Sequence, residues 1–317
     1  MNKANEEPGL PGARPVKLAD LIPMHEPEAV HKEVCLVARL MFKDLDLTLL
    51  DTVFRDISAL FEGRYPSFRG CNTQFHDFQH TTDCYLAMVR LMHGAFLQGV
   101  GFTKRQVVLG LVTALMHDTG YIQEENDSPE QTGGAYTLVH VSRSIDFMDR
   151  YFAQKGLSFE DFELCRRCVK CTGLDVTIKG IRFESDEHAL LGRMLATADL
   201  LGQIAARTYL EKLTYLYREF EEAGVAGFKD ELDLMSKTGA FYVATRRRLE
   251  NELEGVAQYA RSHFATRWGV DEDLYAKAMA RNIEYLDFIL KNHEKEYRSF
   301  LRRGGIFQQA KKERGKQ

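Results

Sequence analysis

Proline is scarce over most of this sequence. Five of the seven prolines lie between Pro8 and Pro27, and none occurs from Glu130 to Gln317. Proline costs about 3 kcal/mol in a helix interior and is common in turns and edge strands. Its absence therefore indicates long helices and argues against an all-β fold.

An excess of positive charge and a long apolar run are also missing. The net charge is −4, so no nucleic-acid partner is expected. The longest apolar run, residues 107–116, is far shorter than the roughly 20 residues that cross a bilayer, so we expect a core helix and no membrane partner. The acidic, proline-broken N-terminus resembles neither a signal peptide nor a transit peptide. We expect a cytoplasmic protein whose six cysteines are free thiols.

The composition, 44% hydrophobic and 28% charged, is that of an ordinary globular protein. Apolar residues recur at helical spacing, which predicts one all-α, multi-helix domain over residues 29–302. A flexible leader (1–28) should precede it and a basic tail (303–317) should follow. Thr48, Thr103 and Ser158 are candidate N-caps. We expect helices over 48–61, 75–97, 104–118, 135–154, 158–171, 187–222, 229–264 and 271–302.

Four of the ten histidines are candidates for chemistry: His76, His80, His117 and His140. His76 and His80 are four residues apart and Asp83 is three further on, which predicts that all three share one helical face. Imidazoles at this spacing can share a metal ion or act on one substrate.

Two carboxylates lie in strongly apolar surroundings. Asp118 follows His117 at the end of the run 107–116, and Asp199 stands alone in the segment LATADLL. A buried carboxylate is costly without a counter-charge, and a divalent ion supplies one. Taken singly, each histidine could be a hydrogen-bonded core residue and each aspartate a helix cap or salt-bridge partner, but together these residues favour a metal site.

The ordered segments FHDFQHTTD, HDTGY and ADLLGQ resemble the H…HD…D signature of the HD superfamily of metal-dependent phosphohydrolases, most closely its cyclic-nucleotide phosphodiesterase branch. The resemblance covers about residues 70–245 and implies an all-α HD-type bundle. It implies one or two divalent ions, of Zn, Fe, Mn or Mg, and a role for each of six residues. His80, His117, Asp118 and Asp199 would bind the first ion, Asp118 would bridge to a second, His140 in HVSRS would bind that second ion, and His76 would be the proton donor.

The implied activity is hydrolysis of a small-molecule phosphodiester, such as a 3′,5′-cyclic nucleotide. A metal-bound hydroxide held at Asp118 would attack in line, and His76 would protonate the leaving alkoxide as general acid. Two alternatives remain open. One is a nucleotide phosphomonoesterase or triphosphohydrolase of the same superfamily, and the other is a non-catalytic metal- or nucleotide-binding module.

Three positions depart from the phosphodiesterase branch. That branch continues His-Asp-x-Asp-His, whereas Gly120 and Tyr121 occupy the last two positions here. Lys237 stands where the branch has its purine-binding glutamine, and a lysine lacks the donor-plus-acceptor pair of an amide. The sequence therefore predicts neither the occupancy of the second metal position nor the base preference.

Overall fold

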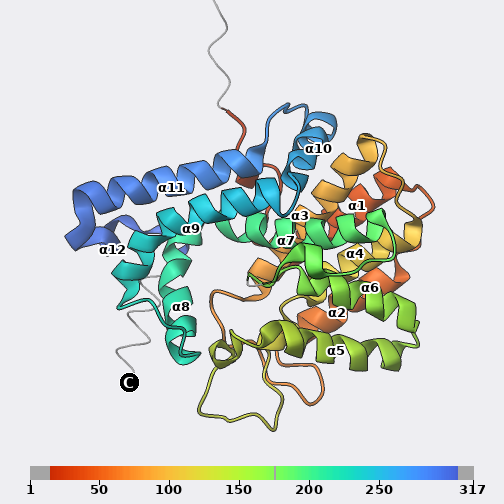
Figure 1. Cartoon of the computed structure of the whole chain (residues 1–317), viewed down its shortest axis with the longest axis horizontal. Helices are drawn as coiled ribbons and strands as arrows, with labels where there is room; N and C mark the ends of the chain where they lie inside the picture. The colour runs from red at the N-terminus through yellow and green to blue at the C-terminus, as the bar shows by residue number, and fades with distance from the viewer. Residues whose placement is uncertain (1–14, 175, 306–317) are drawn as a thin grey trace, which may run out of the picture.

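The computed structural model describes residues 15–174 and 176–305, and these are mainly helical (Figure 1). They contain no β-strand, and one isolated bridge pairs Phe68 with Glu124. The predicted all-α fold is confirmed. Much of the predicted leader and most of the basic tail lie outside the described residues.

The helices are connected by loops and short 3₁₀ turns. None of those in the described part of the chain is both long and apolar enough to span a membrane. Their bounds are α1 Pro27–Met41, α2 Thr48–Phe61, α3 Phe78–Leu97, α4 Lys104–Met116, α5 His140–Lys155, α6 Phe159–Lys170, α7 Asp186–Ile204, α8 Tyr209–Glu222, α9 Glu231–Asn251, α10 Tyr259–Trp268, α11 Leu274–His293 and α12 Tyr297–Phe300.

Helix α3 forms the centre of the molecule. Every residue from His80 to Ala95 is buried, because α1, α4, α7 and α10 all pack against this helix. In Figure 1, α3 and α7 lie between α8, α9, α11 and α12 on one side and α1, α2, α4, α5 and α6 on the other. Polar side chains on α3 are thus forced into the interior, where each needs a partner.

Side-chain caps fix the N-termini of several helices, α3, α4 and α6 among them. The predicted cap at Thr48 was wrong, because Thr48 is the first residue of α2 and Leu47 precedes it. Thr103 accepts a hydrogen bond from the backbone N–H of Gln106, and Ser158 accepts one from Asp161, as the sequence predicts for both. Asp77 caps α3 by accepting from the backbone N–H of His80 at 2.9 Å. A cap at Asp77 starts α3 at Phe78, three residues later than predicted.

Three of the long predicted helices are broken without proline. The one over 271–302 divides into α11 and α12 at a 3₁₀ turn over Glu294–Glu296. Residues 187–222 form α7 and α8, and the Nδ2 of Asn282 donates to the carbonyls of Ile204 and Ala206 at the break, both at 2.9 Å. Residues 229–264 divide into α9 and α10 at Glu254 and Gly255, which adopt positive φ angles of 53° and 67°. The prediction of uninterrupted helices over 187–222, 229–264 and 271–302 was wrong. The side chain of Asn282 binds the end of α7, and a left-handed turn ends α9.

A buried pair of histidines joins α3 to α10. The Nδ1 atoms of His93 and His263 lie 3.1 Å apart. Burial, followed by the positive charges of Arg90 and Arg267 and the neighbouring His93, lowers the pKa of His263 to about 2. Between the pKa of an unfolded chain, near 6.5, and about 2, His263 is therefore neutral in the folded protein and protonated in the unfolded chain.

Replacing His263 with asparagine removes this titration and keeps a polar atom facing His93. As the pH falls below roughly 6, the unfolded wild-type chain binds a proton that the folded protein does not, so His263 costs up to about 1.4 kcal/mol of stability per pH unit. In urea unfolding, His263→Asn should lose less stability between pH 7 and pH 5 than the wild type. His25→Asn, at a side chain that is 80% exposed, should match the wild type. Equal losses in all three proteins would contradict this interpretation.

Candidate metal centre

Four side chains from three segments meet beside α3. His80 comes from α3, His117 and Asp118 directly follow α4, and Asp199 comes from α7. The Nε2 of His80 lies 3.2 Å from Asp118 Oδ2 and 3.1 Å from Asp199 Oδ1. The Nε2 of His117 lies 3.3 Å and 3.8 Å from the same two oxygens. These four residues are called the histidine–aspartate group below.

Three atoms of this group are buried without a hydrogen-bond partner: the Nε2 atoms of His80 and His117 and the Oδ2 of Asp118. The Nδ1 of His117 lies 2.9 Å from the carbonyl of Ala114, which can only accept. Nδ1 therefore carries the proton of a neutral ring, and Nε2 turns its lone pair toward the carboxylates. Facing lone pairs in a buried site require a cation between them.

The charges in the group depend on one another. Burial alone would lower the pKa of His80, but Asp118 and Asp199 outweigh it and raise the pKa to about 9. Burial would raise the pKa of Asp118, but the neighbouring imidazoles, His117 above all, hold it well below its usual range. Without a metal ion the site is neutralised only by protonated histidines.

The donor set fits a divalent ion. The ligand atoms of His80, His117 and Asp118 all lie within 4.8 Å of one another. Bonds of about 2.0–2.2 Å from nitrogen and oxygen place neighbouring ligands about 3 to 3.6 Å apart. Three of the four separations in the group, 3.1, 3.2 and 3.3 Å, fall in that range, and the fourth is 3.8 Å. Two imidazoles with two carboxylates could thus hold one ion.

The other carboxylate oxygen of Asp118, Oδ1, faces a third imidazole, that of His140. Asp118 Oδ1 lies 3.8 Å from the Nε2 of His140, the first residue of α5. The Nδ1 of His140 bonds to the carbonyl of Thr137 at 2.7 Å, so its Nε2 also presents a lone pair. Asp118 could therefore bridge two ions, with His140 as a ligand of the second.

A row of stacked rings lines this side of the centre. The Tyr121 ring lies 4.3 Å from the ring centroid of His76 and 4.6 Å from that of His140, nearly parallel to both. Tyr121 is only 2% exposed. Tyr121 thus packs against both histidine rings, whose own centroids lie 6.3 Å apart.

Glycine is required at two contacts that build the centre. A Cβ on Gly120 would lie 2.0 Å from the carbonyl oxygen of His140, so no carboxylate fits at this position without a shift of α5. A Cβ on Gly202, one turn after Asp199, would lie 2.8 Å from the backbone nitrogen of Cys84. The close approach of α7 to α3 at Gly202 brings Asp199 within reach of His80.

His76 lies outside the helix that was predicted to contain it. The residue precedes the Asp77 cap, so the prediction that His76, His80 and Asp83 share one helical face was wrong for His76. The rings of His76 and His80 nevertheless stand 5.7 Å apart, edge to face. Asp83 accepts from Gln79 at 3.0 Å and is separate from the histidine–aspartate group.

Sequence reasoning missed Glu219, which holds His76 in place. The Nδ1 of His76 lies 2.6 Å from Glu219 Oε2, and Glu219 Oε1 accepts from the backbone N–H groups of Gln74 and Phe75 at 3.1 and 2.8 Å. Glu219 is 4% exposed, although it lies in a segment rich in charge. Its position four residues after Tyr215, on the buried face of α8, was the only available signal.

Lys237 makes local contacts. Its Nζ donates to the carbonyl of Gly227 at 2.6 Å and to Asp233 at 2.7 Å. Lys237 is thus held by neighbours on its own segment.

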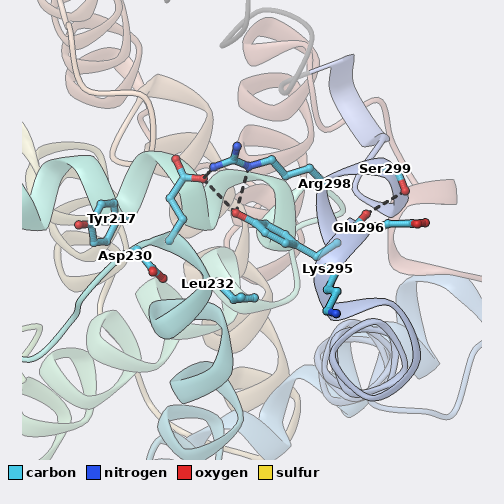
Figure 2. Close-up of a pocket in the computed structure, with 9 residues that line it drawn as sticks. Tyr217, Asp230, Leu232, Lys295, Glu296, Arg298 and Ser299 are labelled. Carbon is cyan, nitrogen blue, oxygen red and sulfur yellow. Dashed lines mark hydrogen bonds and ion pairs between the residues drawn. The ribbon is translucent and has the colours of Figure 1, made fainter.

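A cavity of about 660 Å³ lies away from the centre, between α8, α9 and the segment that leads into α12 (Figure 2). Inside it Glu231 accepts from Tyr297 at 3.3 Å and pairs with Arg298. The residues that line it include no member of the histidine–aspartate group: Tyr217, Asp230, Glu231, Leu232, Lys295, Glu296, Tyr297, Arg298 and Ser299.

A known family matches part of the chain. The model of a family described as Npun_R2479-like matches residues 124–254. That region contains His140 and Asp199, but not His76, His80 or the His117-Asp118 pair. The chain has no match among curated proteins.

Replacing Gly120 with alanine should destabilise the centre. The new methyl group would collide with the carbonyl of His140, and a clash of this kind costs about 1–3 kcal/mol. Gly101→Ala is the matched control because a Cβ there meets nothing within 4 Å, and its effect should stay within about 0.5 kcal/mol. Denaturant unfolding measures the stability of both variants. If Gly120→Ala were as stable as Gly101→Ala, the contact at Gly120 would not require glycine.

Proposed function

We propose that this protein is a metal-dependent phosphoester hydrolase whose substrate is a phosphodiester such as a 3′,5′-cyclic nucleotide. The observation that carries the proposal is the set of buried, unpartnered Nε2 atoms of His80 and His117, which face Asp118 and Asp199. The resemblance of the ordered segments to the HD signature supports the same assignment.

The histidine–aspartate group would hold the first divalent ion, and Asp118 with His140 would contribute to a second position. Bound ions of this class neutralise charge on phosphoryl oxygens and make a coordinated water acidic. The protein excludes bulk water from these ligands, since His80 and His117 are at most 4% exposed. Asp199, whose side chain is 18% exposed, lies on the more open side of the group.

His76 is the proposed general acid. A phosphodiester expels an alkoxide, which is a poor leaving group unless it receives a proton. Glu219 accepts from the Nδ1 of His76 and Tyr121 stacks on its ring, so the ring is oriented from two sides. Nε2 is left as the atom that donates the proton to the leaving oxygen.

The metal assignment predicts that His117→Ala purifies without the ion that the wild type retains and loses turnover. Removal of one imidazole from a four-ligand set also leaves Asp118 with a buried charge and one fewer partner. Elemental analysis after dialysis measures the metal content of each protein. His25→Ala, at an exposed histidine, is the control. A wild-type protein that neither contains nor takes up a divalent ion would refute the metal site.

The general-acid assignment predicts that His76→Ala keeps the metal but turns over a phosphodiester about 10²–10⁴ times more slowly. Glu219→Gln should give a smaller loss, since it weakens the hydrogen bond that orients the ring. Loss of metal from His76→Ala would instead identify His76 as a ligand.

Substrate preference separates the candidate activities. The loaded wild-type protein should hydrolyse bis(p-nitrophenyl) phosphate, cyclic AMP or cyclic GMP faster than p-nitrophenyl phosphate. Preference for the monoester or for a nucleoside triphosphate would support the other activities of the superfamily against our proposal. A metal-loaded protein that hydrolyses none of them would be a binding module.

A further inference from the structure

A second group of metal-binding side chains lies where α1 meets α2. His31 and Cys35 are one turn apart on α1, and Asp51 is on the first turn of α2. The ligand atoms of the three residues all lie within 4.8 Å of one another. None of these residues belongs to the histidine–aspartate group, and the proposed hydrolase function does not use them.

The separations between the three ligand atoms are close to those around a tetrahedral ion. The Nε2 of His31 lies 3.0 Å from Asp51 Oδ1, and the Sγ of Cys35 lies 3.7 Å from each of these two atoms. Bonds of about 2.0–2.3 Å to nitrogen, oxygen and sulfur place tetrahedral ligands about 3.3 to 3.7 Å apart. The two separations that involve sulfur fit this range, and the separation between His31 and Asp51 is shorter. Shifts of a few tenths of an ångström would therefore seat one ion between the three.

His31 is already oriented as a ligand. Its Nδ1 lies 3.1 Å from the hydroxyl of Tyr85 on α3, and its ring stacks on Phe54 at a centroid distance of 4.0 Å. A hydrogen bond at Nδ1 leaves Nε2 to face Cys35 and Asp51. Metal-binding histidines commonly have such an outer partner, which fixes the tautomer and the direction of the ring.

The site is open on one side. The side chain of Asp51 is 51% exposed, whereas that of His31 is 13% exposed. An ion could thus enter from solvent past Asp51, and water could complete its coordination. A thiolate and a carboxylate together carry the two negative charges that balance a divalent ion. Thiolate with imidazole favours Zn²⁺ over the hard ions Mg²⁺ and Ca²⁺.

We propose that His31, Cys35 and Asp51 form a second metal site, which binds Zn²⁺ or a similar thiolate-preferring divalent ion and joins α1 to α2 on the surface of α3. The metal-free alternative is a hydrogen bond between His31 and Asp51 beside a neutral thiol, because burial lowers the pKa of His31. In that state burial, followed by the Asp51 charge, raises the pKa of Cys35 to about 12.

Cobalt binding to the full-length, chelator-treated protein tests the proposal. Co²⁺ bound to a thiolate gives an intense charge-transfer band in the near ultraviolet, whereas the histidine–aspartate group contains no sulfur ligand. The wild type should show the band, and Cys35→Ser should lose it together with one equivalent of bound metal. Cys71→Ser, at another half-buried cysteine, should keep both.

Two further variants make the result specific. His117→Ala should lose metal from the histidine–aspartate group and keep the band. Asp51→Asn, at a side chain that is about half exposed, should weaken the Co²⁺ binding that gives the band by at least about tenfold. A band that survives Cys35→Ser but disappears in His117→Ala would place the thiolate at the other centre and overturn the proposal. So would an absence of the band in wild-type protein that binds Co²⁺.

Discussion

The burial of two carboxylates against two imidazoles, between α3, α4 and α7, is the constraint on which the centre of this protein depends. His117 is fully buried, and three ligand atoms of the histidine–aspartate group, its own Nε2 among them, have no hydrogen-bond partner. In a medium of low dielectric constant, such groups are tolerated only when charge of the opposite sign lies among them. Protons on the histidines can supply it, but a divalent ion supplies it without leaving lone pairs opposed. The burial of these charged groups, which destabilises the fold without a cation, thus makes the site suitable for a metal ion.

Backbone contacts fix the geometry that this constraint requires. Gly202 lets α7 approach α3 so closely that a methyl group would not fit, and Asp199 lies one turn earlier on the same face. Gly120 performs the same role between the segment after α4 and the start of α5, and it places His140 opposite the outer oxygen of Asp118. Glu219 reaches from α8 to the segment before α3 and holds both its backbone and the His76 ring. Two close backbone contacts and one buried carboxylate therefore position residues that are far apart in the chain.

Local chemistry is what could be predicted from the sequence. The bounds of α2, the caps at Thr103 and Ser158, and the convergence of His80, His117, Asp118 and Asp199 all follow from spacing, capping and the cost of buried charge. Long-range contacts were not predictable in the same way. The end of α7 depends on an asparagine of α11, and the role of Glu219 depends on the packing of α8 against the segment before α3. The cluster of His31, Cys35 and Asp51 is formed by two helices, so no pattern within a single segment of the sequence predicts it. The family match over residues 124–254 covers only part of the centre, so the evidence for a metal site is the geometry of the side chains.

Anomalous diffraction from crystals soaked in Mn²⁺ tests the central claim most directly. The account predicts a strong anomalous peak enclosed by the Nε2 atoms of His80 and His117 and by carboxylate oxygens of Asp118 and Asp199. A second, weaker peak between Asp118 and His140 would add the bridging position. Fully soaked crystals with no peak among the four side chains, and with direct hydrogen bonds between the imidazoles and carboxylates instead, would contradict it.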